Sequence, residues 1–294
     1  MSHARMVLPG TVLAVIHRCS EQRWFLKPSP SLNRLIAFLL AHYATKHGIE
    51  LHGFTFMSNH LHLVLTDRRG CLPKFMGEFD SMLSRVVNRR LGRRGRLWEG
   101  AYRSLPLETQ VEVLGHLAYV AANPVEAGVV STPDLWPGLI SLPQQVGTSR
   151  VCTLSRAGLF GCGREGSALP AQATLSLSVP PFFDSEPKVF RRLFRRALAE
   201  TLIEIKTRVR DFKGAGSVKF LDPFSSPAQD LRPTFQLQPH LTNACVTRRA
   251  ELKIWRAAYR AAFARWQEDK TTIFPAGAYL VVVRHKAKAA PPPD

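Results

Sequence analysis

Two histidines separated by one residue are the part of this sequence best suited to chemistry. His60 and His62 lie in a run whose leucines alternate with them, and this period of two is typical of a half-buried β-strand. Because residues i and i+2 of a strand project from the same face, both imidazoles are expected to stand side by side. Such a pair can bind a divalent cation if another part of the chain supplies a third ligand. The alternative is two partly exposed histidines on a sheet surface, since the spacing alone is weak evidence.

A tyrosine and an asparagine further along the chain could complete such a site. Tyr119 and Asn123 are four residues apart in a segment with helical periodicity, so both can point to the same side of a helix. A phenol oxygen would then lie beside an amide oxygen that can act as a third metal ligand. Two alternatives remain open: Tyr119 as a half-buried core aromatic, and Asn123 as the N-cap of a turn that begins at Pro124.

The elements that must position these residues follow from the hydrophobic periodicity of the first 140 residues. The pattern predicts the order β-α-β-β-α-β-α and hence an α+β fold, a ferredoxin-like antiparallel sheet with helices on one face. The histidine side of the sheet would then stay free for a substrate. The expected strands cover 11–17, 54–57, 60–65 and 104–107, and the expected helices cover 31–46, capped by Ser31, then 72–91 and 109–122. The last helix is expected to end at Asn123, because the residue before a proline avoids the α region.

The charge of the chain indicates a polyanionic partner. Lys and Arg number 40 against 22 Asp and Glu, for a net charge of +18, which favours nucleic acid. Residues 141–294 carry net +12, twice the +6 of residues 1–140. A solvated helix face is the alternative for each arginine run. The candidate DNA-binding arginines are Arg85, Arg89, Arg90, Arg93, Arg94, Arg96, Arg103, Arg191, Arg192, Arg195 and Arg196.

The composition after residue 140 suggests two further parts. Residues 141–186 are rich in Pro, Gly and Ser and are predicted to be a loop-rich linker. Residues 187–294 are expected to form a basic, mainly helical C-terminal region. Its expected elements are helices over about 187–209 and 247–267, irregular chain over 213–243, a strand over 279–283 and a disordered tail.

The five scattered cysteines indicate no disulfide framework. No signal peptide or membrane span is evident, and we expect a cytoplasmic protein.

Three motifs together resemble a known family. They are His60-Leu61-His62 after a hydrophobic strand, Leu97-Trp98-Glu99-Gly100 with Tyr102-Arg103, and Tyr119 to Val130, which contains Asn123-Pro124-Val125-Glu126-Ala127-Gly128. Their order and spacing resemble those of the single-tyrosine HUH transposases, and within them the REP-associated tyrosine transposases. The resemblance covers roughly residues 9–137, which would form the first domain, 1–140.

This resemblance implies an enzyme that nicks and rejoins single-stranded or hairpin DNA. By position, His60, His62 and Asn123 would bind Mg²⁺ or Mn²⁺, and Tyr119 would be the nucleophile that forms a 5′-phosphotyrosine. Two other classes stay open. The first is a domesticated DNA-binding regulator on the same scaffold that no longer cleaves, and the second is a replication-initiator or relaxase nickase. Neither the DNA sequence recognised nor the oligomeric state, monomer or dimer, follows from the sequence.

Overall fold

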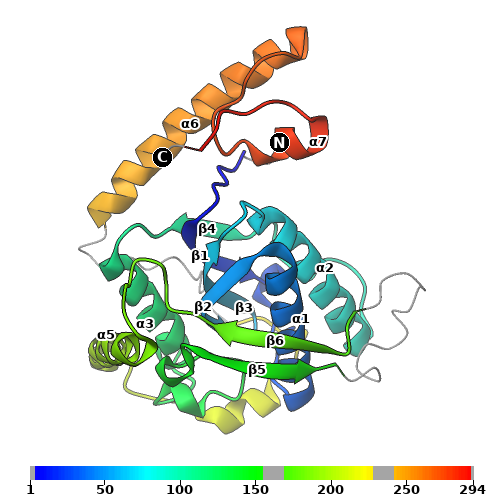
Figure 1. Ribbon diagram of the computed structural model, residues 1–294. Helices are drawn as coiled ribbons and strands as arrows, with labels where there is room; N and C mark the ends of the chain where they lie inside the picture. The colour runs from blue at the N-terminus through cyan, green and yellow to red at the C-terminus, as the bar shows by residue number, and fades with distance from the viewer. Residues whose placement is uncertain (1–3, 155–168, 228–241, 293–294) are drawn as a thin grey trace.

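A four-stranded antiparallel sheet lies at the centre of the molecule (Figure 1). The structure is a computed structural model, and it describes residues 4–154, 169–227 and 242–292. The strand order is β2-β3-β1-β4. The strands are β1 Thr11–Arg18, β2 Ile49–Phe56, β3 His60–Asp67 and β4 Arg103–Pro106. With one helix between β1 and β2 and another between β3 and β4, the arrangement is ferredoxin-like, and the predicted fold class is confirmed.

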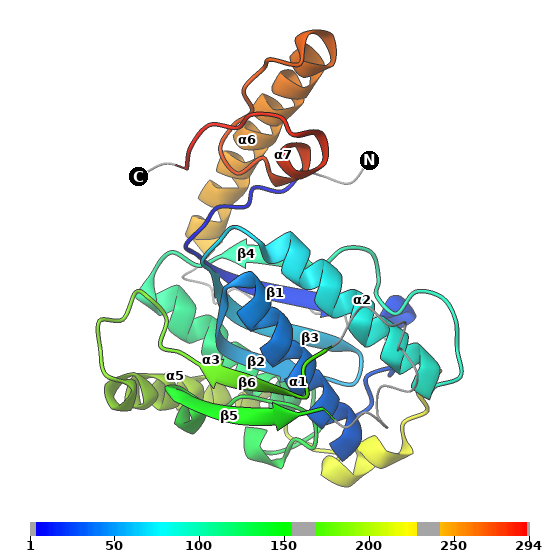
Figure 2. The same ribbon diagram turned by 45° about the vertical axis from the view of Figure 1, so that its right-hand side comes forward.

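Two helices, α1 Pro30–His47 and α2 Leu72–Arg90, cover one face of this sheet (Figure 2). The leucines of β3 point into this layer and are fully buried against both helices. The N-cap of α1 is Ser29, whose hydroxyl accepts from the Leu32 amide, and not Ser31 as predicted. Gly48 ends the helix in the left-handed conformation at φ +67°, which glycine adopts without steric cost.

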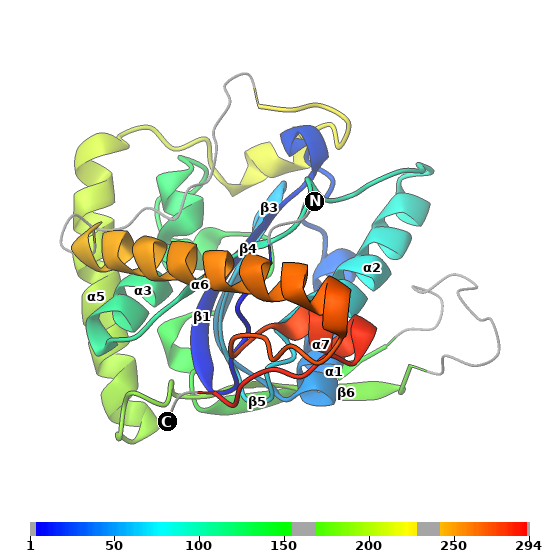
Figure 3. The ribbon, with the colours of Figure 1, turned by 90° about the horizontal axis from the view of Figure 1, so that it is seen from above.

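The other face of the sheet is also covered, by the helix α3 Gln110–Glu126. Figure 3 shows the sheet between α3 on one side and α1 and α2 on the other. The expectation that the histidine side would stay free is therefore wrong. The helix can approach the sheet closely because Gly53 has no side chain: a Cβ there would lie 2.5 Å from Leu117 Cδ2.

The helix α3 does not end at Asn123. It continues through Pro124 to Glu126, and the Ala127 amide donates to the Asn123 carbonyl at 3.0 Å. The prediction of a helix end before the proline is therefore wrong, and so is the alternative that Asn123 caps a new turn. A proline inside a helix removes one backbone donor, and here a threonine hydroxyl of β2 takes its place, as described below.

The segment predicted to be a loop-rich linker contains a β-hairpin. Its strands are β5 Thr148–Thr153 and β6 Gln172–Leu177, and Cys152, Leu175 and Leu177 pack into the α1 layer. Residues 155–168 of this segment lie outside the described residues. The short 3₁₀ helices η2 Pro133–Leu135 and η3 Pro143–Gln145 precede the hairpin. Alternation of polar and apolar residues is brief in both strands, which explains why the sequence pattern missed them.

The predicted basic helix is present as α5 Pro187–Arg208. Its apolar face packs on the outer side of α3, so part of the C-terminal region shares a core with the first domain. The buried residues of this face are Phe190, Phe194, Leu198 and Ile205. The helix η4 Ala215–Phe220 follows, and residues 228–241 of the stretch predicted to be irregular lie outside the described residues.

The last part of the chain forms a helical arm that projects from the body (Figure 1). It consists of α6 Thr242–Asp269 and α7 Tyr279–His285. The strand predicted over 279–283 is wrong: the β-branched run is helical, because its Val281 side chain is buried in a small core with Phe274 and Ala262. Nor is the tail disordered over its described part, since the Phe274 amide donates to the Lys288 carbonyl at 2.8 Å.

The structure also bears on two expected absences, that of a disulfide framework and that of a membrane-spanning helix. Cys19, Cys71 and Cys152 are free thiols, and these are the cysteines whose side chains the structure describes. Among the helices of the described residues, none combines the length and apolar composition needed to cross a membrane.

A buried histidine far from the predicted site gives a testable pH dependence. His52 Nδ1 donates to the Ser178 carbonyl at 3.0 Å and Nε2 accepts from the Thr66 hydroxyl at 2.7 Å. Burial lowers the His52 pKa from 6.5 to about 4. The unfolded chain therefore takes up a proton first as the pH falls below 6.5, and stability is lost on the acid side. Between pH 7 and pH 4.5 this one group should remove about 2 kcal/mol of unfolding free energy.

Urea unfolding of the wild type and of His52→Gln at several pH values measures this loss. The variant is expected to be less stable at pH 7 but to lose about 2 kcal/mol less on acidification. The other buried histidines titrate in both proteins and cancel in the difference. Two parallel stability curves would contradict the assignment.

Candidate active site

The histidine pair lies at the start of β3, on the face of the sheet that α3 covers. His60 and His62 stand side by side, with ring centroids 4.9 Å apart and planes at 84°. In the sheet register, Arg18 of β1 lies opposite His60, and Thr55 of β2 lies opposite His62. Only 8% of the His60 surface and 2% of the His62 surface are exposed.

Asn123 brings an amide group from α3 directly onto both imidazoles. Its Oδ1 lies 3.1 Å from His60 Nε2, and its Nδ2 lies 3.3 Å from His62 Nε2. All three side chains are buried. Two imidazole nitrogens and one amide oxygen thus converge, which are suitable donors for a divalent cation. Among the described residues no group of three His, Cys, Asp or Glu side chains forms a metal site, so Asn123 is the third protein donor that the geometry offers.

A neighbouring asparagine fixes which His60 nitrogen carries the proton. The Asn59 amide nitrogen donates to the Gln22 carbonyl at 3.1 Å, so its oxygen accepts from His60 Nδ1 at 2.7 Å. The neutral ring then directs its Nε2 lone pair at Asn123, and with the amide in this orientation two acceptors face each other. A cation between them would remove that repulsion. Adjacent ligands of a Mg²⁺ ion with bonds of about 2.1 Å are about 3 Å apart, which matches the observed separation.

Burial keeps both imidazoles neutral at physiological pH. It lowers the His60 pKa to about 4, with a smaller lowering from the Arg18 charge. It also lowers the His62 pKa well below 6.5, assisted by the nearby His60 and His116. Neutral imidazole is the form that binds metals, so a cation could bind these nitrogens without displacing protons from them.

Tyr119 lies next to both Asn123 and His62. Its hydroxyl hydrogen-bonds with the Asn123 side chain, and its ring meets the His62 ring edge-on at 5.4 Å. The shared helix face predicted for Tyr119 and Asn123 is therefore present. Burial raises the Tyr119 pKa to about 12, the Glu126 charge raises it further, and the Asn123 hydrogen bond opposes both. The hydroxyl is consequently protonated at neutral pH in the protein alone.

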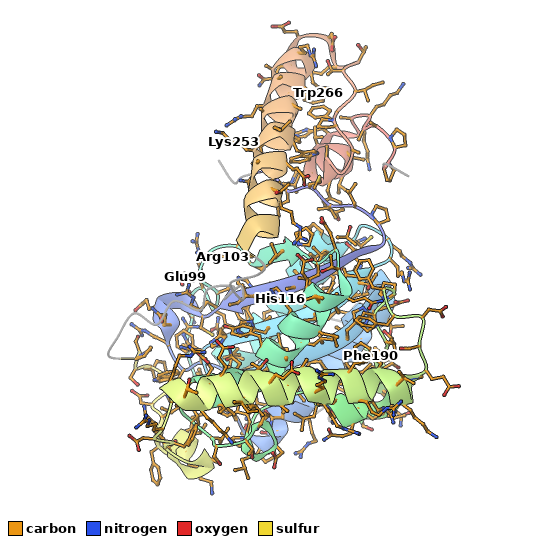
Figure 4. The ribbon with its side chains drawn as sticks, turned by 90° about the vertical axis from the view of Figure 1, so that its left-hand side faces the viewer. Glu99, Arg103, His116, Phe190, Lys253 and Trp266 are labelled. Carbon is orange, nitrogen blue, oxygen red and sulfur yellow. The ribbon has the colours of Figure 1, made fainter. Side chains whose placement is uncertain are left out.

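Two arginines of the sheet lie on the same face as the histidines. Arg18 is opposite His60 on β1, its side chain is 11% exposed, and its Nε lies 3.6 Å from Glu99 Oε2. Arg103, on the edge strand β4, is opposite Ile16, which in turn is opposite His62. Figure 4 shows Arg103 and Glu99 at this edge, above His116 of α3. Sequence reasoning included Arg103 and missed Arg18, because the register that pairs β1 with β3 cannot be derived from local pattern.

The arginines predicted as a cluster in the last turns of α2 and just after it differ in their contacts. Arg85, Arg89, Arg90, Arg94 and Arg96 are exposed, and Arg93 is partly buried. Arg93, in contrast, stacks over the Phe25 ring at 3.9 Å and donates to Asn88 and to the Arg96 carbonyl. Arg90 donates to Ser31 at 2.8 Å and so ties α2 to α1. These contacts give Arg93 and Arg90 a structural role besides any contact with DNA.

The arginines of α5 are divided in the same way. Arg192, Arg195 and Arg196 are exposed, and Arg196 pairs with Glu200 at 2.9 Å. Arg191 is half-buried and its Nε donates to the Val146 carbonyl at 2.7 Å. Three of these four predicted arginines are therefore accessible to a partner, and Arg191 holds the segment before β5.

Comparison with known proteins identifies the first part of the chain. Residues 15–123 match the family model described as IS200-like transposase. No curated protein matches the chain. One similar solved structure, a REP-associated tyrosine transposase bound to a REP hairpin, is 14% identical with a TM-score of 0.42, over 49% of this chain and 84% of that one. Another, a candidate transposase from Deinococcus radiodurans R1, is 19% identical with a TM-score of 0.29, over 38% and 89%.

The family match begins within β1 and ends at Asn123, so it contains both histidines, Tyr119 and Asn123. The predicted enzyme class, a transposase, is confirmed by this match. Residues 124–294 lie outside it. The resemblance to this family that the sequence motifs predicted is thus supported by the match over residues 15–123, under half of the chain.

Proposed function

We propose that this protein is a metal-dependent endonuclease and strand transferase for single-stranded DNA, acting in the cytoplasm near hairpin or repeat sequences, as in the REP-associated branch of its family. One observation carries the proposal: the Tyr119 hydroxyl hydrogen-bonds to the amide that also contacts His60 and His62. A nucleophile and a set of metal donors thus meet at one point, where β3 faces α3.

His60, His62 and Asn123 would hold the divalent cation, Mg²⁺ or Mn²⁺. When bound, such an ion polarises a phosphate and offsets its developing negative charge. The residues around the donors keep them in place: Asn59 orients the His60 ring, and second contacts of this kind commonly determine ligand geometry.

Tyr119 would supply the nucleophile. Its oxygen forms a bond to the phosphorus while the bond from phosphorus to the 3′ oxygen breaks. The phenol proton passes to solvent, and the departing 3′ oxygen takes up a proton to become a free hydroxyl. The products are a 5′-phosphotyrosine and a 3′-OH end. Because the phosphotyrosine conserves the bond energy, a 3′-OH can attack it and rejoin strands without ATP.

The charge around the site suits a nucleic-acid backbone. Arg18 and Arg103 flank the histidines on the same sheet face, where their guanidinium groups could bind phosphates on either side of the scissile one. The exposed arginines after α2 and on α5 would extend this basic surface. Contacts of this type bind the DNA backbone without reading sequence.

A covalent adduct assay tests the proposal. The full-length protein is incubated with a hairpin oligonucleotide carrying a single-stranded flank and with Mn²⁺, and is then denatured and run on a gel. A labelled species shifted by the mass of the DNA is expected with Mn²⁺ and not with EDTA. DNA binding without any adduct, over a panel of hairpins, would instead support the alternative of a non-cleaving DNA-binding regulator.

The exposed arginines of α5 give a separate prediction about the partner. Replacing Arg192, Arg195 and Arg196 together by Gln should weaken binding to all single-stranded sequences alike. The slope of log affinity against log salt should become flatter by up to about 2 units, since each phosphate contact contributes about 0.7. Fluorescence anisotropy at several salt concentrations measures both quantities.

Arg191→Gln is the matched control for this set. Its guanidinium already bonds the Val146 carbonyl, so we expect a lower melting temperature and an unchanged salt slope. If the triple variant also kept the wild-type slope, α5 would be structural support rather than a DNA-binding surface.

A further inference from the structure

A buried hydrogen bond links β2, the strand paired with the histidine strand β3, to the helix α3 that carries Tyr119. In a regular helix the amide of residue 124 would donate to the carbonyl of residue 120, but Pro124 has no N–H. The Val120 carbonyl is nevertheless satisfied, because the Thr55 hydroxyl donates to it at 2.6 Å. Thr55 is completely buried, so no water can take over this role without a rearrangement.

The two residues joined by this bond, Thr55 and Val120, are direct neighbours of the candidate site residues. Val120 directly follows Tyr119 and lies one turn before Pro124, which directly follows Asn123. On the sheet side, Thr55 is the register partner of His62, and residues opposite each other in antiparallel strands project from the same face. One bond therefore joins the residue beside the nucleophile to the residue beside a metal donor.

The helix approaches the sheet closely near this point, because Gly53 of β2 has no side chain next to Leu117 of α3. A directional bond between Thr55 and a backbone carbonyl can fix both the height and the rotation of the helix. An unpaired carbonyl at this buried position would also be unfavourable.

We propose that Thr55 and Pro124 form a positioning device: Pro124 frees the Val120 carbonyl, and Thr55 uses it to hold Tyr119 and Asn123 against His60 and His62. This inference rests on the proposed function, in which those four residues are the nucleophile and metal donors. Displacements of about 1 Å in such a constellation can reduce rates by about a hundredfold.

A rescue experiment tests the device. Thr55→Val keeps the shape of the side chain and removes the donor, and it is expected to slow adduct formation 10- to 100-fold and to weaken Mn²⁺ binding about tenfold, with little change in affinity for DNA. Thr55→Ser retains the hydroxyl and should behave within about threefold of the wild type. Pro124→Ala restores an N–H at residue 124, so the double variant Thr55→Val/Pro124→Ala should recover most of the lost rate and Mn²⁺ affinity.

Thr66→Val is the matched control. The Thr66 side chain is as buried as that of Thr55, but its hydroxyl bonds His52 of β2, whereas that of Thr55 bonds the Val120 carbonyl of α3. This variant should lose stability in urea unfolding while its adduct rate and Mn²⁺ affinity stay at the wild-type level, which separates positioning from general destabilisation.

Two results would overturn the inference. One is a Thr55→Val protein that retains the wild-type rate and Mn²⁺ affinity, and the other is a double variant no better than Thr55→Val. If the wild type itself forms no adduct, the proposed function fails, and Mn²⁺ affinity measured by calorimetry still decides the positioning question: equal affinity in the wild type, Thr55→Val and the double variant contradicts it.

Discussion

Replacing Tyr119 by Phe is expected to reduce covalent adduct formation at least a thousandfold while leaving DNA affinity within about twofold of the wild type. Removal of a covalent nucleophile has effects of this size or larger. The substitution deletes only the hydroxyl, and the ring keeps its edge-on contact with His62. Single-turnover adduct formation and anisotropy with the same hairpin oligonucleotide measure the two quantities.

Tyr43→Phe is the control for this substitution. Tyr43 is also buried and also has a pKa raised by burial, but it lies on α1, on the opposite side of the sheet. This variant should form the adduct at the wild-type rate. An undiminished adduct in Tyr119→Phe would assign the nucleophile to another residue.

Removal of either histidine is expected to have a comparable effect through metal binding. His60→Ala and His62→Ala should each weaken Mn²⁺ binding at least a hundredfold, and their adduct formation should fall to the level of the wild type in EDTA. Each variant also loses a buried ring, so we expect a lower melting temperature. Calorimetric titration with Mn²⁺ at a temperature where the variants remain folded separates the two effects.

Asn123 variants examine the third donor. Asn123→Asp keeps an oxygen near His60 Nε2 and should retain Mn²⁺ binding with an altered preference between Mn²⁺ and Mg²⁺. Asn123→Ser is too short to reach and should lose activity. Because α3 continues past this residue, serine has no capping role here that could compensate. His47→Ala, a buried position on α1 bonded to Glu78, should leave Mn²⁺ affinity unchanged, and an equal loss there would contradict a specific site.

The local geometry of the site could be predicted from the sequence, because it depends on short periodicities. Alternation in β3 places His60 and His62 together, and helical spacing places Tyr119 and Asn123 together. The expected order of strands and helices likewise gives the ferredoxin-like sheet. What brings the two pairs into contact is the docking of α3, which depends on residues distant in sequence such as Gly53 and Leu117.

The errors in the predicted elements have a common physical origin. Local propensity argued for a helix end before Pro124 and for a strand over 279–283, and tertiary contacts overrode it in both places. At Pro124 the override comes from Thr55, a residue of another strand. At Val281 it comes from burial against Phe274. The same limit applies to Arg93, whose partner Phe25 lies far away in the sequence.

Identification of the residue that carries the DNA is the most direct test of the central claim. Adduct formed by the wild type with Mn²⁺ and a hairpin oligonucleotide is denatured, digested with nuclease and protease, and analysed by tandem mass spectrometry. We expect a nucleotide-modified peptide in which the phosphate is attached to Tyr119 through its phenol oxygen. Modification of a different residue, or a modified Tyr119 that forms equally well in EDTA, would contradict the account.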